Sequence, residues 1–422
     1  MSPTQGRDHS DDLLAFLRSS PSPYHAVASA ARRLEGAGFK ELTETDDWTG
    51  ATGGRYVVRG GALLAWYAAE ELPAHGPFRI IGAHTDSPNL RVKPAPDTSS
   101  AGWRQIAVEI YGGVPLNTWL DRDLGISGRI TLRNGSGFLV RIDKPLLRVP
   151  QLAIHLDHGV NDGLSLDRQR HMAPLWGLGE TRSGALLERI AAESGAPMEE
   201  FLGWDLMLHD IQPPGYLGAD EEFIVSSRLD NLVSVHAGLS ALLDAQESAT
   251  VPVLVAFDHE EVGSASATGA AGPMLETVLT RLAGGFDARA EVFAASRALS
   301  CDVTHAAHPN YLGHHDPVHR AVPNRGPALK VNANQRYATD APGAAAWARA
   351  CRDADVPSQV FVSRNTVPCG STVGPIIATR LGIRTVDVGI PVLSMHSARE
   401  LCGVDDPAYL VGAATAFLVD PG

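Results

Sequence analysis

The sequence predicts an α/β protein whose mainly parallel sheet is flanked by helices and interrupted by a β-rich insert. In both outer parts of the chain, short runs rich in β-branched residues alternate with segments of helical periodicity, which is typical of a parallel sheet covered on both faces. Residues 95–214 instead hold short apolar runs separated by glycine-rich turns, the pattern of hairpins. Polar side chains directly follow several predicted strands, and ligands of such sheets bind beyond the carboxyl ends of the strands.

The chain has the length of about two domains. A sequence of 422 residues is longer than a single simple core usually holds. We expect residues 1–94 and 215–422 to form a discontinuous α/β domain, and residues 95–214 to form an inserted β-rich domain.

The composition excludes several classes of protein. The net charge of −13 argues against general nucleic-acid binding, which requires a basic face. No apolar run approaches the roughly 18 residues of a membrane span, and the polar N-terminus does not have the pattern of a secretory signal. The four cysteines show neither zinc-type nor disulfide-type spacing. The sequence therefore predicts a cytoplasmic protein without membrane or nucleic-acid partners.

The N-terminal part is expected to form two helices, a hairpin and a strand. Helical spacing runs through residues 11–40 and is broken by the prolines of segment 20–23. Residues 55–69 have the pattern of a hairpin. The apolar run 78–83 predicts a strand that leads directly into His84.

His84 and Asp86 are two residues apart, so their side chains share one face of an extended chain. Asp86 can then accept a hydrogen bond from one imidazole nitrogen while the other nitrogen binds a metal ion. A polar turn with a hydrogen-bonded histidine explains the same residues, and the tripeptide by itself favours that interpretation.

Within the insert, polar residues 161–182 are expected to form a loop and residues 184–193 a helix. His155 follows an apolar run. By itself, this histidine is more typical of an ordinary core or surface position than of a site.

Two further segments place carboxylates at element ends. Segment 226–245 has helical periodicity, and Asp230 near its start suits either a helix cap or a carboxylate that bridges two metal ions. The buried strand predicted over 251–257 leads into Glu260 and Glu261. At a strand end, where the chain turns, both carboxylates can reach one cleft. A charged, solvated turn is the alternative.

The C-terminal part continues the alternation. Helices are expected over 270–282, 288–298, 344–354, 369–381 and 407–418, and strands over 298–303, 328–332, 359–362 and 384–389. Asp302 ends one strand, Lys330 lies within another, and His396 follows the last. The histidines between 305 and 319 have no fixed spacing, so we expect loop or interface residues there.

Six groups can therefore meet at one predicted sheet edge: His84, Asp230, Glu260, Glu261, Asp302 and His396. Two histidines and three carboxylates suit two zinc ions that share a bridging carboxylate, although Co²⁺ or Mn²⁺ would fit the same ligands. The remaining carboxylate suits a general base. Because zinc lowers the pKa of a bound water from about 15.7 to about 7, a water shared by two ions becomes hydroxide near neutral pH.

The chain contains, in this order, IGAHTDSPNLRVKP (81–94), SRLDNL (227–232), DHEEVGSAS (258–266), HPNY (308–311), LKVNANQRYATD (329–340), PCGSTVGP (368–375) and SMHSARE (394–400). Together these motifs resemble the aspartyl aminopeptidases, zinc exopeptidases with two metal ions that remove N-terminal Asp or Glu from peptides. The match covers almost the whole chain. The family often has Asn where this chain has His259, a position beside the predicted site.

The resemblance implies a zinc-exopeptidase fold and two zinc ions per subunit. His84 and Asp302 would hold one ion, Glu261 and His396 the other, with Asp230 bridging both. Glu260 would be the base that takes a proton from the metal-bound water and passes it to the leaving amine. Asp86 would orient His84.

The resemblance also implies partners. The β-rich insert is similar to a dimerisation domain, and His155 would reach into the site of a neighbouring subunit to stabilise the oxyanion. Lys330 and Tyr337 would surround the substrate, with the Lys330 cation selecting an acidic first residue. The implied assembly is a homo-dodecamer built from dimers, which restricts entry to peptides.

Two other interpretations stay open. The same metal site would serve a carboxypeptidase, a deacylase or an aminopeptidase of broad specificity. A metal-stabilised assembly or cargo-binding shell without activity belongs to another class. The spare carboxylate of Glu260 argues against that shell, because a structural zinc site needs neither a base nor an open position.

Overall fold

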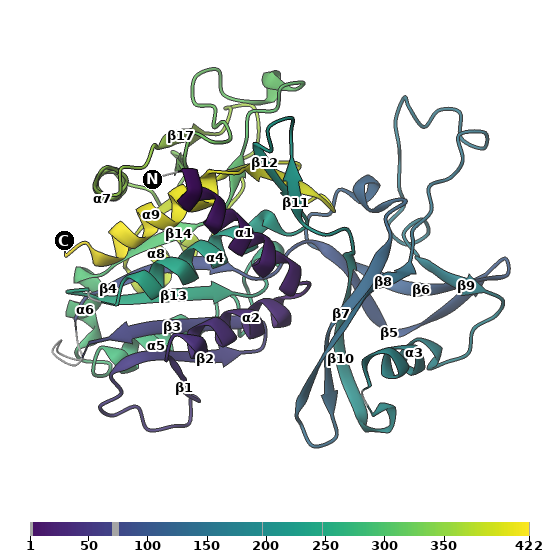
Figure 1. Ribbon diagram of the computed structural model, residues 1–422, viewed down its shortest axis with the longest axis horizontal. Helices are drawn as coiled ribbons and strands as arrows, with labels where there is room; N and C mark the ends of the chain where they lie inside the picture. The colour runs from purple at the N-terminus through teal and green to yellow at the C-terminus, as the bar shows by residue number, and fades with distance from the viewer. Residues whose placement is uncertain (1–2, 70–75, 196, 247, 422) are drawn as a thin grey trace. The chain divides into compact units, whose positions relative to one another are not determined.

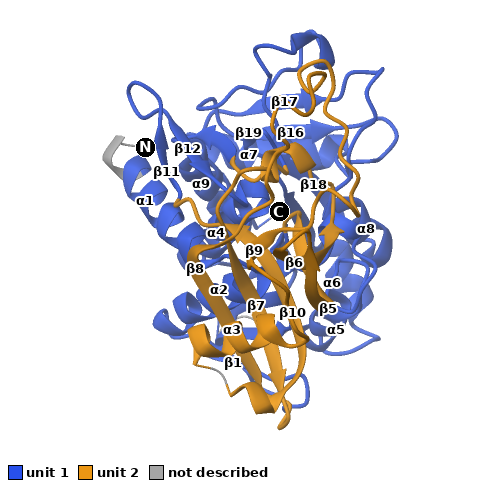
Figure 2. Ribbon diagram, turned by 90° about the vertical axis from the view of Figure 1, so that its right-hand side faces the viewer, with its two compact units in different colours: residues 1–86, 214–395, 400–422 blue, residues 87–213, 396–399 orange. Residues whose placement is uncertain are grey.

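The computed structural model describes residues 3–69, 76–195, 197–246 and 248–421. The chain forms two compact units, which Figure 2 shows in different colours. Unit 1 comprises Met1–Asp86, Pro214–Met395 and Glu400–Gly422, and unit 2 comprises Ser87–Pro213 and His396–Arg399. The domain assignment made from the sequence stays a prediction.

Unit 1 is built on a mixed, mostly parallel sheet. Within the described residues it has nine strands in the order β1-β2-β3-β13-β4-β14-β18-β16-β17. The strands are β1 (Lys40–Glu41), β2 (Gly53–Arg59), β3 (Ala62–Ala68), β4 (Phe78–His84), β13 (Val251–Phe257), β14 (Arg297–Cys301), β16 (Ala328–Val331), β17 (Gln359–Val362) and β18 (Arg384–Gly389). The predicted mainly parallel α/β fold is confirmed.

Helices cover both faces of this sheet because its central strands are apolar on both sides. Along β4, Ile81 packs in the core under α1, α2, α4, α7 and α9, whereas Ile80 packs in the core under α5, α6 and α8. Figure 1 shows α4 and α9 lying across β4 and β13. The helices are α1 (Pro3–Ser19), α2 (Pro23–Gly36), α4 (Leu229–Asp244), α5 (Met274–Leu282), α6 (Arg289–Ala295), α7 (Ala341–Asp353), α8 (Val373–Leu381) and α9 (Asp406–Val419).

A smaller sheet in unit 1 has the order β11-β12-β20-β19-β15 among the described residues. Its strands are β11 (Gly215–Leu217), β12 (Phe223–Ser226), β15 (Thr304–His305), β19 (Pro391–Leu393) and β20 (Glu400–Gly403). Its strands adjoin predicted site residues in the sequence, since β15 follows Asp302 and His396 lies between β19 and β20.

Unit 2 is an antiparallel sheet with one α-helix among its described residues. The strand order is β8-β7-β10-β5-β6-β9. The elements are β5 (Asn89–Ser100), β6 (Trp103–Tyr111), β7 (Leu124–Leu132), β8 (Gly137–Leu147), β9 (Leu175–Leu178), α3 (Ala185–Ser194) and β10 (Phe201–Asp210). In the described part of the chain, no helix is both long and apolar enough to cross a membrane.

Several predicted boundaries were wrong. The helix expected over 270–282 begins only at Met274, because the preceding residues form turns such as the one closed by Ala271 N and Ser264 O, 3.2 Å apart. The helix expected from 369 begins at Val373, since the Thr372 side chain caps it. The loop expected over 161–182 contains β9, which pairs with the edge of β6.

One carboxylate connects three helices of unit 1. Asp12 of α1 accepts hydrogen bonds from Arg33 of α2 at 2.6 and 2.9 Å. Its Oδ2 also lies 2.7 Å from Nε2 of His236 on α4, a fully buried ring. The hydrogen bond to His236 and the pair with Arg33 hold the pKa of Asp12 below its usual range, although partial burial opposes them.

Replacing Asp12 by Ala should lower the free energy of unfolding by about 1–3 kcal/mol, because a buried imidazole nitrogen loses its partner. Asp12→Asn should cost less, since its amide oxygen still accepts a hydrogen bond. The lowered pKa means that the carboxylate stabilises the fold above about pH 4 and less as the pH falls. The melting temperatures of the wild type and of Asp12→Ala, measured from pH 7 to pH 3, should therefore move closer together as the pH falls. A difference that stays constant over this range would contradict the stabilising role of the carboxylate.

Candidate metal centre

Three parallel strands of the large sheet end at the same level. β13 and β4 pair with Phe257 opposite His84, and β14 pairs with β4 with Ser300 opposite Gly82. The residues that follow these strands therefore share one sheet edge, as the sequence predicted from their positions after strands.

His84 is buried and held from one side. Its Nδ1 lies 3.0 Å from the carbonyl oxygen of Asp86 and 3.3 Å from the Asp86 carboxylate. Both partners are acceptors, so Nδ1 carries the hydrogen and the tautomer is set. The opposite nitrogen, Nε2, is left to face other groups, which is the arrangement of a metal-binding histidine.

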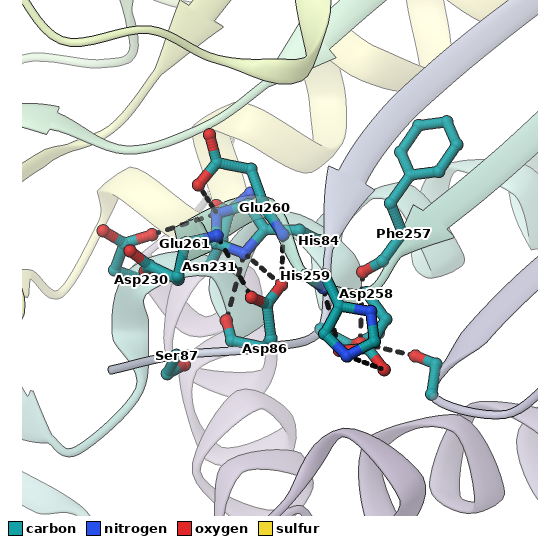
Figure 3. A network of polar contacts seen from close by, with 12 residues as sticks. His84, Asp86, Ser87, Asp230, Asn231, Phe257, Asp258, His259, Glu260 and Glu261 are labelled. Atoms are coloured by element: carbon teal, nitrogen blue, oxygen red, sulfur yellow. Dashed lines mark hydrogen bonds and ion pairs between the residues drawn. The ribbon is translucent and has the colours of Figure 1, made fainter. Parts of the chain in front are cut away.

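Three carboxylates surround that nitrogen. Nε2 of His84 lies 3.3 Å from Asp230, 3.7 Å from Asp302 and 4.0 Å from Glu260. These side chains come from α4, from the end of β14 and from the turn after β13, and Figure 3 shows His84, Asp230 and Glu260 together. The structure thus brings together residues that are 218 positions apart in the chain, counted from 84 to 302.

Asp86 also holds the turn that carries the two glutamates. Its two carboxylate oxygens accept the backbone N–H groups of Glu260 and Glu261, each at 3.1 Å, as Figure 3 shows. The turn is a short 3₁₀ helix, Glu260–Val262, entered through His259 in the left-handed region at φ 64°. The contacts of Asp86 therefore reach beyond the predicted orientation of His84.

Two positioning residues were missed by the sequence reasoning. The Glu400 carboxylate accepts the backbone N–H of Asp230 at 3.0 Å. The Asn231 side chain donates to the carbonyl oxygen of Cys301 at 2.8 Å, which ties the start of α4 to the end of β14. Asp230 and Asn231 have non-helical backbone angles, so the regular part of α4 begins after them. Asn231 lies in the motif SRLDNL and Glu400 in SMHSARE, but nothing in the spacing of these motifs indicates the two contacts.

The residues present fit a metal ion. His84, Asp230 and Glu261 each offer a ligand atom, and these atoms lie within 4.8 Å of one another. One imidazole nitrogen and carboxylate oxygens are ligands that zinc accepts. Asp302 faces the same histidine nitrogen, so its carboxylate belongs to the group.

Burial and the neighbouring carboxylates shift the pKa values of two groups in the site. Burial lowers the pKa of His84, but hydrogen bonds to the carboxylates, Asp230 first, outweigh it and hold the pKa well above 6.5. Burial raises the pKa of Glu260 to about 7, with the His84 charge opposing and the Asp302 carboxylate reinforcing the rise. A pKa near neutrality suits a group that exchanges protons with water.

Lys330 and Tyr337 lie beside this group. Lys330, buried in β16, places Nζ 4.0 Å from the Asp302 carboxylate and 5.1 Å from the centre of the Tyr337 ring. Burial raises the pKa of Tyr337 well above its usual value, so its hydroxyl is neutral at physiological pH. A buried cation thus stands next to a predicted metal ligand.

Two predicted site residues belong to unit 2. Nδ1 of His396 lies 3.2 Å from the carbonyl oxygen of Gly113, and His155 is exposed in a turn. Their roles as metal ligand and as partner-subunit residue stay predictions.

Comparison with known proteins identifies the family of this chain. A family model described as "Aminopeptidase I zinc metalloprotease (M18)" matches residues 16–418. The chain belongs to the M18 family. It is therefore a zinc metallo-aminopeptidase of the aspartyl aminopeptidase and Ape1 type, and the resemblance seen in the motifs is confirmed.

The relatives of this M18 aminopeptidase cover it over nearly its whole length. It is 58% identical over 422 residues to the "Probable M18 family aminopeptidase 2" of Streptomyces coelicolor, with 98% of each chain covered. It is 49% identical over 421 residues to the protein of that name from Mycobacterium tuberculosis, with 96% of this chain and 97% of the other covered.

Solved structures of the family share its fold. A chain of the "Ape4 and Nbr1 complex" superposes with a TM-score of 0.95 at 37% identity, covering 98% of this chain and 86% of that chain. The Saccharomyces cerevisiae "mApe1 dodecamer" gives a TM-score of 0.84 at 29% identity, covering 97% and 96%. Dodecameric homologues of this M18 aminopeptidase therefore exist.

Asp86→Asn should weaken zinc binding about 10- to 100-fold, the usual effect of losing a group that orients a metal ligand. The amide cannot accept both backbone N–H groups of the Glu260 turn, so the turn and His84 lose their common support. Zinc content after dialysis against a graded chelator measures the effect. Asp12→Asn, the same charge change at a residue whose partners are Arg33 and His236, serves as the control, and equal zinc retention in both variants would argue against the positioning role.

Proposed function

We propose that this M18 aminopeptidase removes N-terminal Asp and Glu from peptides, using two zinc ions per subunit. The observation that supports it is the convergence of the Asp230, Asp302 and Glu260 carboxylates on Nε2 of His84, with the Lys330 cation beside Asp302. The proposed ligands are His84 and Asp302 for one ion, Glu261 and His396 for the other, and Asp230 for both.

Zinc bound there would lower the pKa of a water molecule and polarise the peptide carbonyl. The protein's part is proton movement and positioning. Glu260 lies 4.0 Å from Nε2 of His84 through its carboxylate, and its side chain is partly open to solvent. We assign it the role of the base that takes a proton from the attacking water and delivers it to the leaving amine.

Lys330 is the proposed selector of an acidic first residue. A buried ammonium group attracts a carboxylate strongly, because neither water nor salt screens the pair well. Its Nζ is already 4.0 Å from Asp302. If Asp302 is engaged with zinc, the positive charge of Lys330 is available to the side chain of the substrate, and Tyr337 supplies a neutral wall.

The proposal extends to the assembly. Homologues form dodecamers, and we propose that this chain does so through dimers made by the β-rich domain, residues 95–214, beside the catalytic domain of residues 1–94 and 215–422. His155, exposed in its own chain, would enter the site of a neighbour and stabilise the oxyanion. A cytoplasmic location and Co²⁺ or Mn²⁺ as alternative metals complete the proposal.

One observation favours a second candidate, an aminopeptidase that also accepts neutral first residues. The Lys330 ammonium faces a carboxylate and a ring, and both partially satisfy it. If Lys330 keeps these contacts when substrate is bound, a peptide with an acidic first residue is preferred little over one with a neutral first residue.

Glu260→Gln should retain zinc and lower kcat by about 10²- to 10⁴-fold, the usual contribution of a general base. The amide keeps the size of the side chain but cannot accept a proton. Metal analysis and steady-state kinetics on an Asp peptide measure the two effects separately. Glu261→Gln is the matched control and should lose zinc as well as turnover. Equal metal loss from both variants would contradict the division between base and ligand.

Lys330→Met should lower the Asp-to-Leu ratio of kcat/KM at the first substrate residue by about tenfold or more, because a charge-assisted hydrogen bond contributes roughly 1.5–3 kcal/mol. Met retains most of the buried volume of the side chain, and Lys330→Arg retains the charge as a control. Competition between Asp- and Leu-peptides, followed by mass spectrometry, gives the ratio directly. An unchanged ratio in Lys330→Met would exclude Lys330 as the selector and support the second candidate.

A further inference from the structure

A buried carboxylate in unit 1, that of Asp387, has no part in the proposed ligand set or in the proposed proton transfer. It is fully buried in β18, where a charged group is costly unless the surrounding protein compensates it. β18 lies between β14, whose Ser300 is opposite Asp387, and β16, which carries Lys330. Asp387 is therefore placed between the strand that leads to Asp302 and the strand of the proposed selector.

The Asp387 carboxylate joins two segments of the chain. One oxygen accepts the backbone N–H of Ala338 at 2.6 Å, and the other accepts the Thr372 hydroxyl at 2.6 Å. The backbone N–H of Asp387 donates to the Thr339 hydroxyl at 3.0 Å. The first turn of α8 packs directly on the carboxylate, because a Cβ added at Gly374 would lie 2.5 Å from both of its oxygens. The carboxylate is therefore held in one orientation by groups from both segments.

Both segments support Tyr337. Ala338 directly follows Tyr337 in the chain, so its hydrogen bond to Asp387 fixes the backbone that carries the ring. Cys369, shortly before Thr372, packs against the small core cluster that contains Tyr337. The centre of the Tyr337 ring is 5.1 Å from Nζ of Lys330. Asp387 therefore helps to place the ring that lies beside the Lys330 ammonium.

Asp387 also compensates the charge of Lys330. Val388 pairs with Leu329 in the antiparallel register of β18 and β16, so Asp387 comes next to Lys330 in that register. Burial raises the pKa of Asp387, and the Lys330 charge is one of the effects that oppose this rise. The oxygens of Asp387 already accept two other hydrogen bonds. The carboxylate therefore compensates the Lys330 charge while the N–H groups of Lys330 stay available to a substrate carboxylate.

We propose that Asp387 is a positioning residue for the first substrate residue: it holds the Tyr337 ring and the Lys330 ammonium in the arrangement that receives an acidic side chain. The inference rests on the proposed selection of acidic first residues by Lys330. Asp387 acts through these two side chains and does not touch the substrate. Because hydrogen bonds weaken steeply when their distances and angles change, loosening the pair reduces the preference for acidic residues. Neutral first residues do not depend on the pair and are still cleaved.

The test substitutes Asp387→Asn, which keeps the size of the side chain but removes its negative charge and one of its two acceptor oxygens. The zinc-loaded enzyme is assayed on Asp-Ala-Ala-Ala and Leu-Ala-Ala-Ala. The Asp-to-Leu ratio of kcat/KM should fall about tenfold, the effect of weakening one charge-assisted hydrogen bond. The fall should come from a higher KM for the Asp peptide, with zinc content and kcat on the Leu peptide unchanged, because substrate binding and not the chemical step is disturbed.

Asp406→Asn is the matched control. Asp406 is another fully buried carboxylate that accepts two backbone N–H groups, those of Asn324 at 2.8 Å and Gly326 at 3.0 Å. These partners lie in a loop that carries no proposed site residue. Asp406→Asn should therefore lower the melting temperature and leave the Asp-to-Leu ratio unchanged.

The outcomes separate the role of Asp387 from the proposed specificity. An unchanged ratio in Asp387→Asn, equal losses on both peptides, or the same fall in Asp406→Asn would overturn the inference. A wild type without preference for Asp over Leu would refute the proposed acidic specificity, and the inference with it. A wild-type preference that Lys330→Met abolishes but Asp387→Asn leaves intact would refute only the role of Asp387.

A second pair of variants covers the case in which Asp387→Asn does not fold. Thr372→Val removes the hydroxyl that donates to Asp387 and should lower the Asp-to-Leu ratio about threefold or more, as expected for one lost hydrogen bond. Thr372→Ser keeps the hydroxyl and should keep the ratio. The same ratio in Thr372→Val and Thr372→Ser would overturn the inference.

Discussion

One buried carboxylate, that of Asp86, contacts both halves of the candidate metal centre. It accepts the backbone N–H groups of Glu260 and Glu261 and lies beside Nδ1 of His84. The end of β4 and the turn after β13 therefore cannot move independently, and Nε2 of His84 faces the acidic side chains. Because Asp86 is fully buried, two backbone donors would lose their acceptor without it, which costs on the order of 1–3 kcal/mol for each group.

The same arrangement places several negatively charged carboxylates close together, and a bound metal ion would neutralise their repulsion. Asp230, Asp302 and Glu260 bring carboxylates to one imidazole nitrogen at low solvent exposure, where like charges repel and desolvation is expensive. Burial above all raises the pKa of Glu260, and hydrogen bonds to the surrounding carboxylates raise that of His84. Divalent cations are the natural counter-charge for such a group, in agreement with the zinc metalloprotease family of the chain. Lys330 adds a positive charge beside the Asp302 carboxylate of this group.

Much of the fold could be predicted because apolar periodicity reports directly which residues are buried. The runs that end at Phe257 and near His84 became adjacent parallel strands, and the residues placed after them share an edge. The start of α4 was less predictable: Asp230 and Asn231 leave helical geometry to meet Glu400 and Cys301. Glu400 and Cys301 lie far along the chain from α4, so the local helix propensity of the sequence does not indicate these contacts. The contacts of Asp387 with Ala338 and Thr372 were likewise hidden, since the three residues lie on separate segments.

The sequence by itself determined the class of the fold, the alternation of strands and helices over much of the chain, and the acidic and imidazole groups available to a metal, because these follow from local patterns and motifs. Only the tertiary structure decided that the Asp86 carboxylate supports the Glu260 turn, that Lys330 stands against Asp302, and that the Asp387 carboxylate joins the segment after Tyr337 to the start of α8. The physical reason is that a hydrogen bond or ring contact depends on distances of a few ångströms between segments, and no periodicity along the chain encodes such distances.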